Sequence, residues 1–490
     1  MNVLLINTNR MRPVIAPIGL DYLADPLVAA QHQVRLLDLA WSEDVAGVIE
    51  QTLRGFAADL LAVTVRNIDD CYFSSQAFFL AEIKQIVEML RRASDAPIVL
   101  GGVGFSVAPA AVLDYCGADF GIAGDGELAL VELLKALDRR TGWERVPNLL
   151  YRDESRIRQN RRVPVDLSRL PPRRRALVDN ARYFAQGGQA GFETKRGCSM
   201  ACIYCADPVA KGRVARCLPP TRVVAELSAL LAQGIDHLHT CDSEFNLPAD
   251  HARELCQALI AAGLGDKVRW YAYCAPKPFN EELAALFKRA GCAGIDFGAD
   301  SGCDEMLRRL KRHFTTADLA STAAVCRRHQ IPFMYDLLVG GPGETRKTLR
   351  QTIDFMRRVE PDCVGLSIGM RVYDRTPVAR QVRAEGELAT NPNLHGVKHG
   401  NPHFLRPVFY LSPQVGEDVV ACVRELVAGD SRFFLPEEAQ ANANYNYNDN
   451  PELVRAIKKG ARGAYWDILR RRCLRPERFA SGRDARVSRG

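Results

Sequence analysis

Short apolar runs alternate with stretches of helical spacing along the first part of the chain. Runs rich in Val, Leu and Ile predict buried strands at residues 2–8, 34–39, 60–65, 98–100 and 120–123. Apolar residues spaced as on a helix predict helices at 19–30, 78–92 and 110–115. This alternation predicts an α/β domain over residues 1–150, a doubly wound parallel sheet of the flavodoxin or Rossmann kind. A ligand of such a sheet lies beyond the carboxyl ends of the strands.

The alternation stops in a polar stretch rich in Arg and Pro and then resumes with longer helices. We predict a linker over residues 151–188. Further strands are predicted at 237–241, 268–273, 294–298, 332–340 and 363–368, and helices between them at 218–233, 249–262, 281–290, 316–329 and 345–359. Six such units predict a partial (β/α)6 TIM-like barrel over residues 189–375, with its site at the strand carboxyl ends. Residues 376–490 are predicted to form a mostly helical substrate or lid region that ends in a basic tail.

Composition narrows the class of protein. The 490 residues are 47% hydrophobic and 25% charged, as in ordinary soluble proteins. Fifteen cysteines are spread along the chain, which predicts a reduced, cytoplasmic protein and not a disulfide scaffold. The amino terminus resembles a first strand more than a signal peptide, and no apolar run is long enough for a bilayer. The net charge of +7 lies largely in the linker and the tail, so we expect neither a nucleic-acid nor a membrane partner.

One tight group of cysteines carries the candidate chemistry. Cys198, Cys202 and Cys205 follow a C-x3-C-x2-C spacing within KRGCSMACIYCADP. Three thiolates leave one iron of a [4Fe–4S] cube without a protein ligand and open to a small molecule. The alternatives are a structural zinc site completed by a distant residue, or three buried thiols. Zinc motifs usually pair two C-x2-C halves, and the sequence has no second half.

The cysteine spacing, with Tyr204 before the last cysteine, resembles the radical S-adenosylmethionine (SAM) superfamily. Three later motifs strengthen the resemblance: DSEFN at 242–246, FGADSG at 297–302, where Asp replaces a usual Glu, and VGGPGET at 339–345. The resemblance implies a [4Fe–4S] cluster, bound SAM and an electron donor such as flavodoxin or ferredoxin. It implies SAM contacts from Tyr204, Asp242, Glu244, Asp300, Ser301, Gly341, Pro342 and Gly343. Helix capping by Asp242 and plain turn formation by the Pro-Gly pair are the structural alternatives.

The amino-terminal half resembles the cobalamin-binding domain that precedes many radical SAM domains. The likeness rests on PIGL at 17–20, RNIDD at 66–70, the pair at 101–102 and GDGE at 124–127. It implies corrinoid contacts from Arg66, Asn67, Gly101, Gly102, Gly124, Gly126 and Glu127. The D-x-H-x-x-G motif that places a histidine on cobalt is missing, so a base-off, His-off cobalamin is expected, with Arg66 a candidate for its lower face. A domain that kept the fold and lost the cofactor is the alternative.

Together these resemblances imply a cobalamin-dependent radical SAM alkyltransferase. The activity implied first is C-methyl transfer to an unactivated carbon of a small-molecule biosynthetic intermediate. The alternatives are transfer of the 3-amino-3-carboxypropyl group of SAM to a soft atom such as As(III), an oxidative cyclisation, or a non-catalytic iron–sulfur and corrinoid sensor.

Two features near the carboxyl terminus are candidate substrate contacts. Tyr445 and Tyr447 lie in ANANYNYNDN, which could line a polar pocket or form a surface loop. Cys473 lies in RRCLRP, which resembles a degraded RCCLKC tail of one cobalamin-domain radical SAM group and matches it at Arg471, Cys473 and Leu474. That group is the source of the aminocarboxypropyl alternative.

Overall fold

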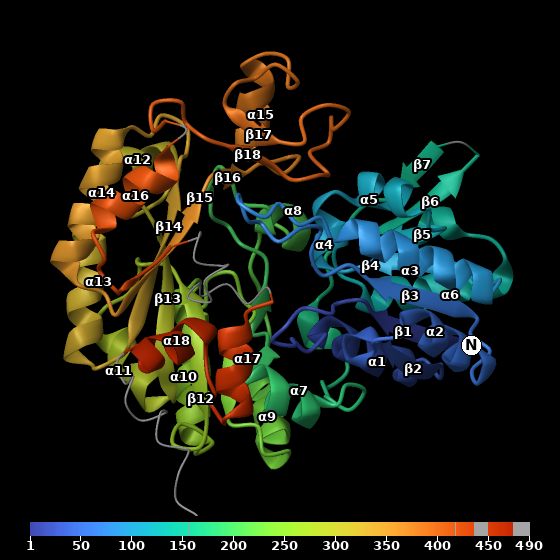
Figure 1. Ribbon diagram of the computed structural model, residues 1–490. Helices are drawn as coiled ribbons and strands as arrows, with labels where there is room; N and C mark the ends of the chain where they lie inside the picture. Colours follow the sequence, from blue (N-terminus) through green and yellow to red (C-terminus); the bar gives the residue numbers. More distant parts are fainter. Residues whose placement is uncertain (155, 417, 436–448, 474–490) are drawn as a thin grey trace, which may run out of the picture.

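The computed structural model describes residues 1–154, 156–416, 418–435 and 449–473. Two α/β domains lie side by side, and segments from the last part of the chain reach across the barrel and toward the amino-terminal domain (Figure 1). None of the helices in the described ranges combines the length and apolar character that crossing a bilayer requires.

The amino-terminal domain is built on a seven-stranded sheet of order β2-β1-β3-β4-β5-β6-β7. Its parallel strands are β1 (Asn2–Asn7), β2 (Gln33–Asp38), β3 (Leu60–Thr64), β4 (Ile98–Gly101) and β5 (Phe120–Ile122). One face is covered by α1 (Ile18–Ala29) and α6 (Glu127–Arg139), the other by α2 (Val45–Arg54), α3 (Leu80–Ala93) and α5 (Pro109–Cys116). The predicted doubly wound sheet is therefore confirmed. Its strand order reverses between β1 and β3, where such sheets bind ligands.

Two antiparallel strands extend this sheet beyond the predicted pattern. They are β6 (Leu149–Asp153) and β7 (Arg156–Gln159), so the domain boundary predicted at residue 150 falls inside a hairpin. The sequence of β7, RIRQ, has a single apolar residue because this edge strand exposes most of its side chains. Hydrophobic periodicity gives no signal for such a strand.

The second domain is a parallel, open barrel of order β19-β15-β14-β13-β12-β11-β8. Its strands are β8 (Ala190–Phe192), β11 (His237–Thr240), β12 (Arg269–Cys274), β13 (Cys292–Asp300), β14 (Phe333–Val339), β15 (Cys363–Ile368) and β19 (Phe433–Phe434). The outer helices are α9 (Pro220–Ala232), α10 (Ala249–Ala261), α11 (Glu281–Arg289), α13 (Thr316–Arg328) and α14 (Arg346–Val359). The predicted six-unit barrel is confirmed, and β19 from the carboxyl-terminal region adds a strand beside β15.

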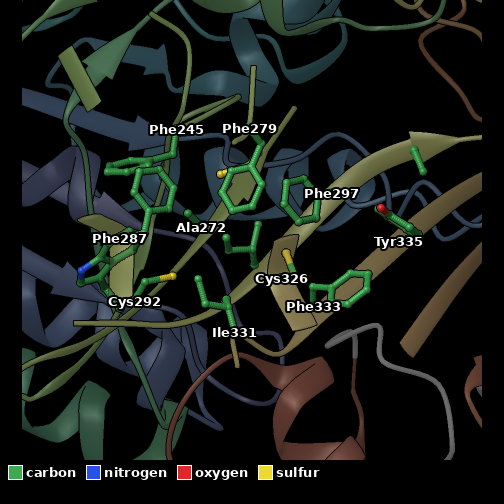
Figure 2. Close-up of a cluster of buried hydrophobic side chains, with 14 of the residues drawn as sticks. Phe245, Ala272, Phe279, Phe287, Cys292, Phe297, Cys326, Ile331, Phe333 and Tyr335 are labelled. Atoms are coloured by element: carbon green, nitrogen blue, oxygen red, sulfur yellow. The ribbon is translucent and has the colours of Figure 1, made fainter. Parts of the chain in front are cut away.

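An aromatic core joins the barrel strands to the outer helices (Figure 2). Phe245, Trp270 and Phe287 pack with ring centroids 4.9–5.3 Å apart, in tilted and edge-to-face arrangements. Such pairs add to the stabilisation from apolar burial. Because Phe245 is fixed in this core, the turn after β11 is anchored immediately beside Glu244.

The carboxyl-terminal region contributes both helices and strands. A small sheet is formed by β16 (Met370–Arg371), β17 (Leu394–Gly396) and β18 (Val408–Tyr410), next to α15 (Pro377–Ala384). Helix α16 (Val419–Val427) packs on α14, outside the barrel. Helices α17 (Pro451–Lys458) and α18 (Tyr465–Cys473) pack against the inner face of the barrel strands, where Tyr271 donates a hydrogen bond to Asp467 at 2.8 Å.

Candidate radical SAM and corrinoid site

The three clustered cysteines lie on a loop held by a short hairpin. Strand β9 (Lys195–Arg196) precedes them and pairs with β10 (Arg216–Cys217). Between strand and loop, Gly197 has a φ of 94°, and a Cβ there would meet the Val214 carbonyl oxygen at 2.2 Å. Only glycine fits this turn. The amide of Cys198 then donates to the Gly212 carbonyl at 3.0 Å, so the loop is fixed where the first thiol begins.

The three thiols have the chemistry of ligands to an iron–sulfur cube. Cys198 and Cys202 are buried and Cys205 is half-buried, and burial raises the pKa of all three thiols. In a cube each of three irons takes its own thiolate. Three cysteines on one loop therefore fit the cluster that the sequence predicts.

A buried arginine that the sequence did not reveal lies beside this loop. Arg312 donates from Nη1 to the Cys202 sulfur at 2.7 Å and from Nη2 to the Gly298 carbonyl at 2.6 Å. Its Nε lies 3.2 Å from Asp300 Oδ2, the same oxygen that accepts from the Tyr204 hydroxyl at 2.6 Å. Tyr204 and Asp300, two predicted SAM contacts, are thus brought together by one guanidinium next to a cluster thiol. No local sequence pattern marks Arg312, because its partners come from distant strand ends.

Glu244 is the acidic residue of the DSEFN turn that belongs to this group. Its Oε1 lies 3.7 Å from Arg312 Nη2. Burial raises the pKa of Glu244 to about 7, against the lowering influence of Arg312. After burial itself, its negative charge is among the causes that raise the pKa of Cys198 and Cys202. This placement supports the predicted role of Glu244 beside SAM.

Asp242 has a different place from the one predicted. Its carboxylate accepts from the Thr194 amide at 2.9 Å and the Thr194 hydroxyl at 2.5 Å, and lies 3.3 Å from Lys195 Nζ. The side chain is buried and its oxygens are already occupied. We therefore assign Asp242 to holding the end of β8, and so the start of the cluster loop, in place of a contact with the SAM ammonium group.

The remaining predicted SAM residues lie at the ends of β13 and β14. Ser301 is buried, and its hydroxyl is 2.9 Å from the Thr352 hydroxyl of α14. Gly341, Pro342 and Gly343 form the turn after β14. Glu344 closes this turn, because its Oε2 accepts from the Gly340 amide at 2.5 Å. Burial raises the pKa of Glu344 to about 7. Glu344 therefore holds the two ends of the turn together, and Ser301 contacts α14 from its own strand end.

A pocket of about 300 Å³ lies in the amino-terminal domain where β1 and β3 end. It is lined by Thr8, Asn9, Arg10, Met11, Arg12, Arg66, Asn67, Phe79, Glu82, Ile83 and Asp449. Asn9 Nδ2 and Arg10 Nε are buried there without a hydrogen-bond partner. Two orphaned donors in a pocket at the switch point fit a ligand with many acceptor atoms, as the side chains and nucleotide tail of cobalamin have. The predicted residues Arg66 and Asn67 line this pocket.

The predicted corrinoid glycines lie at the neighbouring strand ends. Gly101 ends β4, and Gly102 follows with a φ of 102°, where a Cβ would meet the Val65 carbonyl at 2.6 Å. Gly124 and Gly126 flank Asp125 in the loop between β5 and α6. The side chains of Arg162 and Leu23 fill the space at the second pair, because a Cβ at Gly124 would meet Arg162 at 2.7 Å and one at Gly126 would meet Leu23 at 3.1 Å.

Glu127, the last of the predicted corrinoid residues, contacts the barrel domain. It is buried, and its Oε1 lies 2.6 Å from Arg196 of β9, immediately before the cluster loop. Its Oε2 is buried without a hydrogen-bond partner, and its contact with the corrinoid stays a prediction. Tyr445 and Tyr447 lie outside the described residues. Cys473 ends α18, and its side chain also lies outside the described part of the structure.

Comparison with known proteins agrees with both halves of the site. The radical SAM superfamily matches residues 192–356, and the B12 binding domain matches residues 5–134. The tryptophan 2-C-methyltransferase of Streptomyces laurentii is 34% identical, over 78% of this chain and 74% of its own. The solved structure of TsrM from Kitasatospora setae, a radical SAM methyltransferase with tryptophan and a SAM analogue bound, superposes with a TM-score of 0.90. It is 30% identical and covers 98% of this chain and 100% of its own. The chain belongs to the cobalamin-dependent radical SAM methyltransferases.

Membership confirms the predicted C-methyltransferase activity and its three cofactors, a [4Fe–4S] cluster, SAM and cobalamin. The cobalamin-dependent radical SAM enzyme OxsB superposes with a TM-score of 0.72 at 16% identity, which shows a shared fold alone. The sensor alternative is thereby set aside, because the enzyme has methyltransferase relatives that match along most of its length. The substrate of the enzyme is a small molecule, as predicted.

Proposed function

We propose that the enzyme methylates C2 of the indole ring of tryptophan or of a closely related indole amino acid. The observation that carries the proposal is the extent of the likeness to TsrM, whose structure is described with tryptophan substrate bound. Because the superposition includes 98% of this chain, it extends over the carboxyl-terminal segments that pack inside the barrel and beyond its strand ends. Substrate contacts in this fold come from those regions.

The barrel domain would hold the cluster and SAM, and the amino-terminal domain would hold the corrinoid. When bound, SAM would be the source of the methyl group, cobalamin would supply methyl-carrier chemistry, and the cluster would supply reducing chemistry. Cys198, Cys202 and Cys205 would hold the cluster, and Glu244 with Asp300 would face SAM. The pocket and rim around Arg66 would hold the corrinoid. Arg312 keeps the carboxylates and the thiol of this group at fixed positions, which is the alignment that methyl transfer needs.

An anaerobic assay with tryptophan deuterated at C2 tests the proposal. We expect a product heavier by one methyl and lighter by the deuterium, since methyl replaces that atom at C2. Tryptophan already methylated at C2 is the matched control, and it should give no product. A methylated product that keeps the deuterium would place the reaction at another carbon. Turnover of SAM without any methylated tryptophan would exclude tryptophan as substrate.

The co-products distinguish two routes to the same product. Hydrogen abstraction by a deoxyadenosyl radical forms one 5′-deoxyadenosine and one S-adenosylhomocysteine for each methyl transferred. Methyl transfer with loss of a proton forms S-adenosylhomocysteine alone. An indole C2 is not an unactivated carbon, so we expect the second ratio with tryptophan. This expectation replaces the unactivated carbon implied at first by the sequence resemblance.

We further propose that a flavodoxin or ferredoxin reduces the enzyme in the cytoplasm, and that neither nucleic acid nor membrane is a partner. Flavodoxin and ferredoxin should each replace a chemical reductant in the assay. Activity that depends on added vesicles or RNA would contradict this proposal.

A further inference from the structure

A buried group of ion pairs joins the corrinoid domain to the base of the cluster loop. Arg196, in β9, is two residues before Cys198. Its guanidinium contacts three carboxylates: Asp125 at 3.1 Å, Glu127 at 2.6 Å and Glu193 at 2.8 Å. Asp125 and Glu127 belong to the loop and helix that follow β5 in the corrinoid domain. Each nitrogen of the guanidinium thus has its own carboxylate.

Asp125 also holds the second strand of the hairpin. Arg216 of β10 pairs with Asp125 Oδ2, and its backbone is paired with that of Arg196 across the hairpin. Arg173 binds Glu193 at 2.6 Å. The group therefore contains three arginines and three carboxylates, and Arg173 also contacts Glu226 at 3.4 Å.

The ion pairs of this group are largely buried, which strengthens them. The side chains of Arg196, Asp125, Glu127 and Glu193 are exposed by 12%, 9%, 4% and 13%. Burial works to raise the pKa of Glu193, yet Arg196 and Arg173 outweigh it and lower that pKa to about 2. Charge-assisted hydrogen bonds in such surroundings are strong and directional. The pairs consequently fix the hairpin against the rim of the corrinoid domain, where helix α4 (Val103–Val107) also packs on α8 (Asp207–Lys211) just after the last cysteine.

We propose that Asp125 and Glu127 are positioning residues that set the distance and angle between the cluster loop and the corrinoid. They act through Arg196 and contact no cofactor or substrate. The inference rests on the placement of the cluster and the corrinoid given above. It does not depend on the identity of the methyl acceptor.

Glu127→Gln tests the inference, because it removes one charge and keeps the shape of the side chain. Glu132→Gln is the matched control: it lies on the same helix, α6, but its side chain is 47% exposed and pairs only with Lys135. Both variants and the wild type are purified anaerobically with cobalamin. Iron and corrinoid are assayed, and the electron paramagnetic resonance spectra of reduced cluster and cob(II)alamin are recorded in the same sample.

We expect Glu127→Gln to keep its iron and corrinoid and to change the magnetic interaction between the two paramagnetic centres, which depends on their separation. Its kcat should fall ten- to a hundredfold with little change in KM, as expected for misplacement of reacting groups by about 1 Å. Glu132→Gln should match the wild type in every respect. If Glu127→Gln is recovered unfolded, Glu127→Asp takes its place, because it keeps the charge and shortens the side chain. We then expect the same altered magnetic interaction and a lower kcat.

Three results would overturn the inference. One is a Glu127→Gln spectrum and kcat equal to those of the wild type. Another is loss of corrinoid with the cluster intact, which would make Glu127 a corrinoid contact. The third is an equal effect of Glu132→Gln. Because the spectra need no methyl acceptor, these outcomes are separate from a failure of tryptophan as substrate.

Discussion

Arg175 carries the largest predicted effect of a single substitution on stability. Its side chain is 1% exposed and joins both domains, contacting Asp21 of α1 at 2.9 Å and Glu226 of α9 at 2.8 Å. It also donates to Asn180 at 2.8 Å and to the Gly191 carbonyl at 2.9 Å. Arg175→Met removes these contacts and leaves two carboxylates buried at the domain interface.

The size of this stability loss depends on the hydrogen-bond donors that Asp21 and Glu226 keep in the variant. Breaking a buried ion pair by removing one partner costs about 3–5 kcal/mol. Asp21 keeps three donors, the amides of Leu177 and Val178 and the side chain of Asn180, while Glu226 keeps Tyr22 and Arg173. We therefore expect the lower end of that range, about 3 kcal/mol, or roughly a hundredfold in the unfolding equilibrium.

Urea unfolding of the apo protein, followed by circular dichroism, measures this loss. Arg54→Met is the control, because Arg54 is 75% exposed and its pair with Glu50 spans 4.0 Å, so its loss should cost less than about 0.5 kcal/mol. The double variant Arg175→Met with Glu226→Gln should be more stable than the sum of the single losses, since it removes one stranded charge. A loss below about 1 kcal/mol for Arg175→Met, or strict additivity in the double variant, would show that Arg175 does not stabilise the domain interface.

Three further predictions concern the site itself. Burial raises the pKa of Glu344 to about 7 from 4.5, so the folded state holds that proton more tightly than the unfolded chain. The free energy of unfolding should therefore fall by up to about 3 kcal/mol as pH rises from 4.5 to 7. Glu344→Gln should remove this part of the pH dependence, as measured by urea unfolding. Arg312→Gln removes a cationic donor to the Cys202 sulfur and should lower the midpoint potential of the cluster in a redox titration, with unchanged iron content. Gly197→Ala should reduce iron incorporation sharply, whereas Gly234→Ala, whose Cβ would meet nothing within 4 Å, should leave it unchanged.

Sequence pattern predicted the architecture where apolar strands are buried on both faces. The parallel strands of both sheets read as apolar runs because helices cover them. The pattern failed at β7, which lies at an edge, and at β19, a two-residue strand whose pairing with β15 depends on the return of a distant segment. Neither strand has enough buried positions to produce a periodic signal.

The site was predictable where its residues form local motifs. The cysteine loop, Glu244 and the turn at Gly341 are read from contiguous letters. Arg312 was missed, because a single arginine after a helix carries no pattern until the fold brings it to the thiols. The ion pair of Glu127 was missed for a related reason, because a motif gives the position of a residue along the chain and not its partner. The fold pairs it with Arg196.

Three thiols should hold the iron–sulfur cluster independently of the separate corrinoid domain. Anaerobic purification with cobalamin, followed by iron, sulfide and corrinoid assay, compares the wild type with the Cys198→Ala, Cys202→Ala, Cys205→Ala triple variant. We expect the variant to lose its iron and sulfide and to keep its corrinoid, because the pocket around Arg66 lies in the other domain. Iron and sulfide retained by the triple variant, or a wild type that binds zinc in their place, would contradict this expectation.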